Sequence, residues 1–153
     1  MCTFLADRKV AERQAKAAKE HLKARGFEAN IEVVNDTSNP IQKGSSIVLW
    51  AKSNTSTLLG ADAIGELRKS SEAVGHEAAE NLFKELKAEA TVDVHLADML
   101  VPYVALAEGN SIYIVRSMTG HLDTNIWLTQ KILGVKFKVT RVGNLFRIEK
   151  KET

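Results

Sequence analysis

The sequence predicts an α+β fold built from two small α/β layers. Apolar residues recur at helical spacing in four segments and in alternating or short runs in several others. Their order is β-α-β-β-β-α followed by α-β-α-β-β, which places two groups of helices and strands one after the other. The 153 residues are 44% hydrophobic and 26% charged, so one ordinary core or two small ones can form.

The first group of elements is expected between residues 3 and 88. Alanines and Leu22 at helical spacing support its first helix, and Gly26 marks the end. Alternation supports the second strand, and Ser71 is expected to cap the last helix. The expected elements are a strand at 3–6, a helix at 9–25, a strand at 29–34, paired strands at 47–52 and 55–61, and a helix at 71–88.

The second group follows a short stretch of small or polar residues, which predicts domains at 1–89 and 90–153. Its hairpin is indicated by Gly143 and Asn144 between two apolar runs. The expected elements are helices at 92–107 and 124–133, a strand at 112–117, and hairpin strands at 136–142 and 145–149. Trp50 and Trp127 are expected in the core rather than stacked on bases.

Composition also bears on where the protein works. A single cysteine, Cys2, cannot form an internal disulfide, which fits a reducing compartment. The first residues are too short and too quickly charged for a signal peptide, and no apolar run approaches about 18 residues. A cytoplasmic protein without a membrane span is expected. His21 and His76 lack a metal-ligand partner at i+4 and are expected to be exposed, and no zinc-like cluster exists.

The segment from Gly120 to Asn125 carries the strongest functional signal. It lies between an apolar strand and an apolar helix, and it contains His121. Unpaired N–H groups and the positive end of a helix dipole favour a phosphate at such a turn. The same dipole favours a neutral imidazole, which can attack phosphorus. A solvated or capping histidine is the alternative. Thr124 and Asn125 are expected to cap the helix.

A second candidate segment lies on the preceding helix. His95, Asp98 and Met99 share one face, because they are spaced i, i+3 and i+4. Pro102 cannot donate to the carbonyl of Asp98, so that carbonyl is expected to be free and the helix to bend there. The alternative is a solvated Asp98 beside a partly packed His95.

Basic residues gather near the end of the chain, although the net charge is only +2. Residues 131 to 151 include seven basic residues and one acidic residue, Glu149. They form either a hairpin edge protected from aggregation or a phosphate-attracting face near His121. The seven are Lys131, Lys136, Lys138, Arg141, Arg147, Lys150 and Lys151.

The sequence resembles the RNA 3′-terminal phosphate cyclase family, because five short segments match that family and follow one another in the same order as in its members. They are Val-Ala-Glu-Arg-Gln at 10–14, Ser-Ile-Val-Leu-Trp-Ala at 46–51, Val-Gly-His-Glu-Ala-Ala at 74–79, His-Leu-Ala-Asp at 95–98 and Gly-His-Leu-Asp-Thr-Asn at 120–125. The resemblance implies that residues 1–89 are a small inserted domain. Residues 90–153 are then the end of a catalytic domain built of repeated βαβαββ units, whose first part is absent.

The resemblance also implies an activity. His121 attacks the α-phosphorus of ATP and becomes a histidyl-AMP, with a divalent metal (Mg or Mn) as a further cofactor. AMP passes to the 3′-phosphate end of RNA, and attack by the 2′-hydroxyl yields a 2′,3′-cyclic phosphate. The segment that matches the family's ATP contacts comprises His95, Leu96, Ala97, Asp98 and Met99. Many members have an aromatic residue in place of His95 and glutamine in place of Met99.

Two further interpretations come from other classes of protein. Because the first part of the family's chain is absent, activity is expected to need an N-terminal cyclase half in trans. A non-catalytic RNA-binding or ribosome-assembly module of cyclase-like fold is the main alternative. A fragment that forms homo-oligomers through exposed strand edges is the third.

Overall fold

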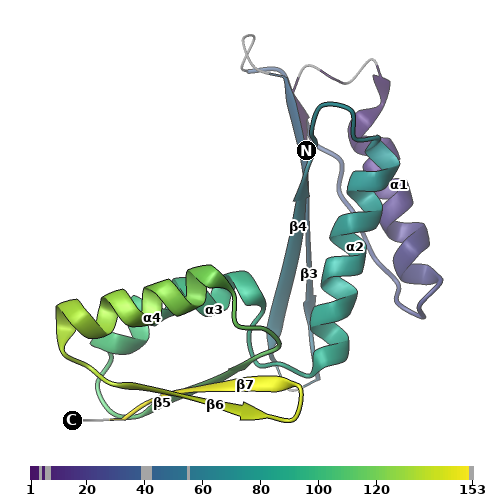
Figure 1. Ribbon diagram of the computed structural model, residues 1–153. Helices are drawn as coiled ribbons and strands as arrows, with labels where there is room; N and C mark the ends of the chain where they lie inside the picture. Colours follow the sequence, from purple (N-terminus) through teal and green to yellow (C-terminus); the bar gives the residue numbers. More distant parts are fainter. Residues whose placement is uncertain (4, 6–7, 39–42, 55, 152–153) are drawn as a thin grey trace. The chain divides into compact units, whose positions relative to one another are not determined.

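The computed structural model describes residues 1–3, 5, 8–38, 43–54 and 56–151. These residues form an α+β structure of two compact units, as predicted. One unit comprises residues 1–51 and 60–84, and the other comprises residues 52–59 and 85–153. Each unit is an arrangement of helices beside a sheet (Figure 1).

The first unit contains a sheet of four strands in the order β2-β1-β3-β4. Strand β1 pairs parallel with β2 and antiparallel with β3, so the sheet is mixed. The helices α1 and α2 lie along this sheet (Figure 1). The elements are β1 (Cys2–Thr3), α1 (Val10–Lys23), β2 (Asn35–Asp36), β3 (Gly44–Lys52), β4 (Leu58–Ile64) and α2 (Ser71–Ala88).

Small residues let the two helices of the first unit approach closely. A side chain at Gly75 would collide with the backbone carbonyl of Gln14, so glycine is needed where α2 crosses α1. Ala17 also lies close to Gly75, and further alanines and leucines of the two helices and the sheet are buried. The buried apolar residues include Ala11, Ala17, Ala18, Leu22, Ile47, Leu49, Ala61, Ala63, Val74, Ala78, Ala79 and Leu82.

The second unit packs two helices on one face of an antiparallel sheet of three strands, β5-β7-β6 (Figure 1). Its elements are α3 (Val94–Leu106), β5 (Ser111–Val115), α4 (Gly120–Leu133), β6 (Phe137–Val142) and β7 (Leu145–Lys150). Pairing of Tyr113 with Ile148 and of Ile148 with Val139 sets the register. The core consists of Val92, Ala97, Val101, Tyr113, Val115, Leu122, Ile126 and Ile148.

One buried carboxylate supports the second unit. Glu85 is buried, and one of its oxygens accepts from Arg116 Nε at 2.7 Å. Its other oxygen, Oε2, has no hydrogen-bond partner among the described residues. Burial raises the pKa of the Glu85 carboxyl, and the attraction of Arg116 offsets this only in part.

The predicted order of elements is confirmed, but several boundaries were wrong. The predicted strand at 29–34 is irregular, and the strand that pairs with β1 is the following dipeptide, Asn35–Asp36. Ser70, rather than Ser71, caps α2, because its Oγ accepts from Ala73 N at 3.1 Å. The prediction of strand at 3–6 falls partly on residues outside those described.

Expectations for three large side chains were also wrong. Trp50 is 69% exposed and Trp127 is 58% exposed, so neither fills a core. His21 is partly buried, because its Nε2 lies 3.0 Å from Glu80 Oε2, whereas His76 is exposed as expected. None of the described helices has the length and apolar character needed to cross a membrane.

Candidate functional site

His121 lies in the first turn of α4 and is exposed. The helix begins at Gly120, four residues earlier than predicted, because Thr119 is its N-cap. Thr119 Oγ1 accepts from Leu122 N at 3.1 Å. Among the described residues, the N–H groups of Gly120 and His121 have no acceptor, as is usual in a first turn. These two donors and the imidazole are therefore available to an anion.

The direction of His121 is set by the apolar face of the same helix. Leu122 and Ile126 are buried in the core of the second unit. Successive helical residues are about 100° apart, so a buried Leu122 turns His121 toward the edge of that face. At the other end, Gly134 adopts a positive φ of 71° and closes the helix.

Asn125 joins α4 to α3 at the position where Pro102 removes a helical hydrogen bond. Asn125 Nδ2 donates to the carbonyl oxygen of Asp98 at 3.1 Å. The expectation that this carbonyl is free was therefore wrong, as was the expectation that Thr124 and Asn125 cap α4, because both lie inside the helix. Because His121 lies one turn before Asn125, the bond places His121 and the Asp98 segment on neighbouring parts of the two helices.

A groove of about 380 Å³ runs between α3 and α4. Its volume lies within the range usual for small-molecule sites. The walls are mostly apolar, and the polar groups lie at Asp98, Asn125 and Thr129. The lining residues are Asp98, Met99 and Pro102 of α3 and Asn125, Leu128, Thr129, Ile132 and Leu133 of α4.

The five residues predicted on α3 do not share one environment. His95, Leu96 and Met99 are exposed, and Asp98 is half-buried beside the groove. Ala97 is buried in the core and supports the segment from behind, because its carbonyl accepts from the Tyr113 hydroxyl at 3.0 Å. The structure thus brings Asp98 and Met99 into one groove wall.

Tyr113 of strand β5 connects the sheet to the segment of α3 that contains Ala97 and Asp98. Burial, with a further contribution from the nearby Asp98 carboxylate, raises the pKa of Tyr113 to about 12. The hydroxyl therefore keeps its proton and its hydrogen bond to the Ala97 carbonyl throughout the neutral range. Sequence reasoning assigned no role to Tyr113.

Comparison with known proteins identifies the chain's family. Residues 1–87 match the family model described as "RNA 3'-terminal phosphate cyclase (RTC), insert domain". The chain belongs to the RNA 3′-terminal phosphate cyclase family. Similar curated cyclases include one from Pyrobaculum neutrophilum, 49% identical over 92% of this chain and 40% of the relative. Another, from Methanosarcina mazei, is 43% identical over 91% of this chain and 37% of the relative.

These matches extend beyond the insert domain. The alignment with the Pyrobaculum neutrophilum cyclase spans 142 residues, so it includes much of the second unit. The chain spans about 40% of the length of the curated cyclases it matches. The boundary at residue 89 stays a prediction.

The basic residues near the end of this cyclase-family chain differ in their environments. Lys150 is 5% exposed, and its Nζ donates to the carbonyls of Ala107 and Gly109 at 2.7 and 2.9 Å. Arg147 lies 3.2 Å from Glu149. Lys150 therefore belongs neither to an exposed hairpin edge nor to a phosphate-attracting face, because it ties β7 to the end of α3.

The described residues include no group of three histidine, cysteine or acidic side chains arranged to hold a metal ion. Asp98 is the one carboxylate among the lining residues of the groove. A divalent ion that enters with a nucleotide takes most of its ligands from phosphates and water, so a single carboxylate fits that mode of binding. Asp98 is the candidate side chain for it.

Two features of the site escaped sequence reasoning. Thr119 stands three residues before the buried Leu122, which is the spacing of a capping residue, and this signal was available. The bond from Asn125 to Asp98 depends on how α3 and α4 pack, and nothing local in the sequence indicates it.

Proposed function

We propose that this chain supplies the histidine nucleophile of an ATP-dependent RNA 3′-terminal phosphate cyclase. The observation that carries the proposal is the position of His121: exposed, in a capped first turn with free N–H groups, one turn from the bond that joins α4 to the Asp98 segment. Membership of the cyclase family supports the assignment of ATP and RNA as substrates.

The first step is proposed to form the nucleotide intermediate. An imidazole nitrogen of His121 attacks the α-phosphorus of ATP, and the bond to the β-phosphoryl oxygen breaks. Pyrophosphate leaves with the electron pair of that bond, and AMP stays on the ring. The free N–H groups of Gly120 and His121 and the dipole of α4 stabilise negative charge on the phosphoryl oxygens. Asp98 would help to hold a divalent ion bound with the nucleotide, and such an ion would supply positive charge for the departing pyrophosphate.

The next steps are proposed to transfer activation to RNA. An oxygen of the RNA 3′-phosphate attacks the adenylate, which releases His121 and leaves AMP on the RNA end. The neighbouring 2′-hydroxyl then attacks the 3′-phosphorus, loses its proton and expels AMP. Each displacement is easier than direct condensation, which is the benefit of a covalent intermediate.

The groove between α3 and α4 is proposed to hold part of the nucleotide. Its apolar wall at Leu128 and Ile132 suits the face of a base, and Asp98 suits the ribose or a metal-bound phosphate. Met99 offers a thioether and no amide, so it contacts the base by packing alone. The remaining ATP and RNA contacts are proposed to come from the N-terminal half of a cyclase.

The proposal is tested by measuring conversion of an RNA 3′-phosphate to a phosphatase-resistant 2′,3′-cyclic end. The chain is mixed with ATP, Mg²⁺ and the N-terminal part of the Pyrobaculum neutrophilum cyclase. We expect the wild-type mixture to cyclise the RNA, His121→Ala to abolish cyclisation, and the matched His76→Ala to retain it. Cyclisation that persists in His121→Ala contradicts the assignment.

A non-catalytic RNA-binding module is the alternative, and the same experiment separates the two. A mixture that binds RNA equally well with histidine or alanine at position 121, and that cyclises none of it, favours this alternative.

A further inference from the structure

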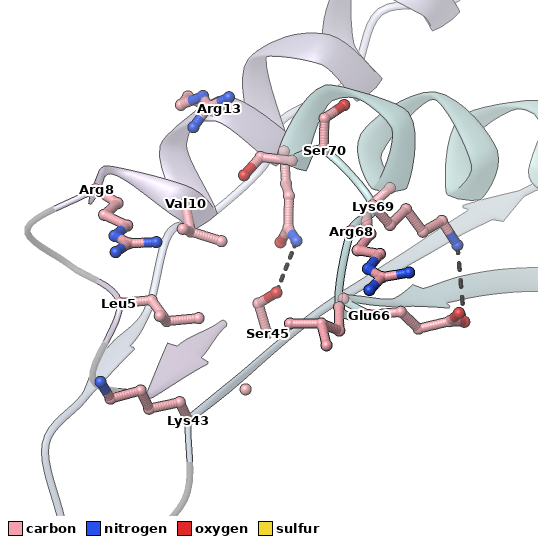
Figure 2. Close-up of a pocket in the computed structure, with 16 residues that line it drawn as sticks. Leu5, Arg8, Val10, Arg13, Lys43, Ser45, Glu66, Arg68, Lys69 and Ser70 are labelled. Carbon is pink, nitrogen blue, oxygen red and sulfur yellow. Dashed lines mark hydrogen bonds and ion pairs between the residues drawn. The ribbon is translucent and has the colours of Figure 1, made fainter.

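The first unit contains a second pocket, of about 550 Å³, far larger than one phosphate group. It opens where α1, β3 and α2 begin and where β1 and β4 end, and Figure 2 shows basic side chains on both sides of it. The basic side chains most relevant to ligand binding here are Arg8, Lys43 and Arg68. Nothing in the proposed chemistry at His121 uses this pocket.

The charge of the pocket is only partly neutralised. Arg13 is paired with Glu72 at 2.7 Å, and Lys69 is paired with Glu77. Arg8, Lys43 and Arg68 are exposed and make no ion pair within the described ranges. They come from three separate segments of the chain, so together they present an array of positive charge rather than a single point.

A buried amide gives a second and independent indication of a ligand. Gln14 is 1% exposed and lines the pocket, and its Nε2 donates to Ser45 Oγ at 2.9 Å. Its Oε1 has no partner among the described residues. A buried acceptor without a donor is destabilising, so a ligand that brings a hydroxyl group here gains a hydrogen bond.

The first residues of two helices also line this pocket. Val10, the first residue of α1, and Ser71, the first residue of α2, both line it. The N-cap of α1 is Lys9, whose side chain makes no capping hydrogen bond. First-turn N–H groups therefore add to the positive field around the unpaired cations.

From these observations, we propose that the pocket binds the ribose–phosphate backbone of single-stranded RNA. The unpaired cations on separate segments suit successive phosphates, and the orphaned acceptor of Gln14 suits a ribose 2′-hydroxyl. No aromatic side chain is among the lining residues, so bases are not stacked and binding is independent of sequence. This inference deepens the proposed function, because it assigns the insert domain to holding the RNA substrate.

The test measures binding of a fluorescein-labelled oligouridine to the 153-residue chain by anisotropy. The oligonucleotide ends in a 3′-hydroxyl, so it is no substrate for cyclisation. The triple variant Arg8→Ala, Lys43→Ala, Arg68→Ala is compared with a control triple, Lys19→Ala, Lys23→Ala, Lys84→Ala, which removes the same charge from exposed positions of the same unit.

We expect the pocket triple to weaken binding at least tenfold and the control triple to weaken it less than threefold. Each lost phosphate contact lowers the slope of log affinity against log salt by about 0.7, so three contacts lower it by about 2. Equal effects of the two triples overturn the proposal, because binding then follows overall charge. Displacement of the bound oligonucleotide by inorganic phosphate at an equal concentration also overturns it.

A DNA oligonucleotide of matching length tests the role of Gln14 without a change to the protein. The wild-type chain is expected to bind it several-fold more weakly than RNA, and Gln14→Met is expected to bind both equally. A wild-type chain that binds RNA and DNA alike contradicts the assigned contact. Failure of this proposal is distinct from failure at His121, because adenylylation of His121 by ATP needs no RNA.

Discussion

Truncation of Leu122 is predicted to loosen the helix that carries His121. Leu122 is 0% exposed and packs in the core of the second unit, whereas Leu128 of the same helix is 43% exposed. Leucine-to-alanine changes at fully buried sites cost about 2–5 kcal/mol, because a cavity adds to the lost transfer energy. We expect Leu122→Ala to lower the free energy of unfolding by about 3 kcal/mol. The matched change Leu128→Ala should lower it by about 1 kcal/mol or less.

The assay is urea denaturation followed by tryptophan fluorescence. Trp50 belongs to the first unit and Trp127 to the second, so a Trp50→Phe background makes the signal report on the second unit alone. With a urea dependence of about 2 kcal/mol per molar, the midpoint should fall by about 1.5 M for Leu122→Ala. Equal shifts for the two leucine variants refute the placement of Leu122 in the core.

Three further changes test the site and its support by the same urea assay. Asn125→Ala should lower the free energy of unfolding by about 1–3 kcal/mol, because the Asp98 carbonyl loses its donor. A decrease below about 0.5 kcal/mol, which is about a twofold change in the unfolding equilibrium, argues against the bond. Thr119→Ala should lower the free energy of unfolding by about 1 kcal/mol because the N-cap is lost, whereas Thr119→Ser keeps a capping hydroxyl and should retain most of the wild-type stability. The raised pKa of Glu85 means that the native state holds its proton longer than the unfolded state, so stability falls as pH rises above about 4.5. Glu85→Gln removes this pH-dependent loss, so the free energy of unfolding of the variant should rise relative to that of the wild type between about pH 4 and pH 7. A difference between the two proteins that stays constant over this range contradicts the raised pKa.

Much of the fold could be predicted because its signals are local. The hairpin of β6 and β7 follows from Gly143, which adopts the positive φ that the turn requires. Helix α1 follows from the alanines that let it pack against α2. The strand expected at 29–34 did not form because alternation alone does not provide a partner strand, and the residues that pair with β1 as a strand are Asn35–Asp36.

The candidate site could be predicted only in part. The exposed histidine at a strand-to-helix junction is a local feature, and the structure has it in the first turn of α4. The role of Asn125 and the burial of Lys150 depend on contacts between elements distant in sequence. Trp50 and Trp127 show the limit of reasoning from residue type, because large apolar side chains were expected inside and both are exposed.

The most direct test of the account is whether His121 accepts AMP. The chain is incubated with ATP labelled in the α-phosphate, with and without the N-terminal part of a related cyclase, and the labelled peptide is mapped. The account predicts an acid-labile, alkali-stable label on the peptide that contains His121, absent from His121→Ala and present in His76→Ala. Label that survives in His121→Ala, or no label under either condition, contradicts it.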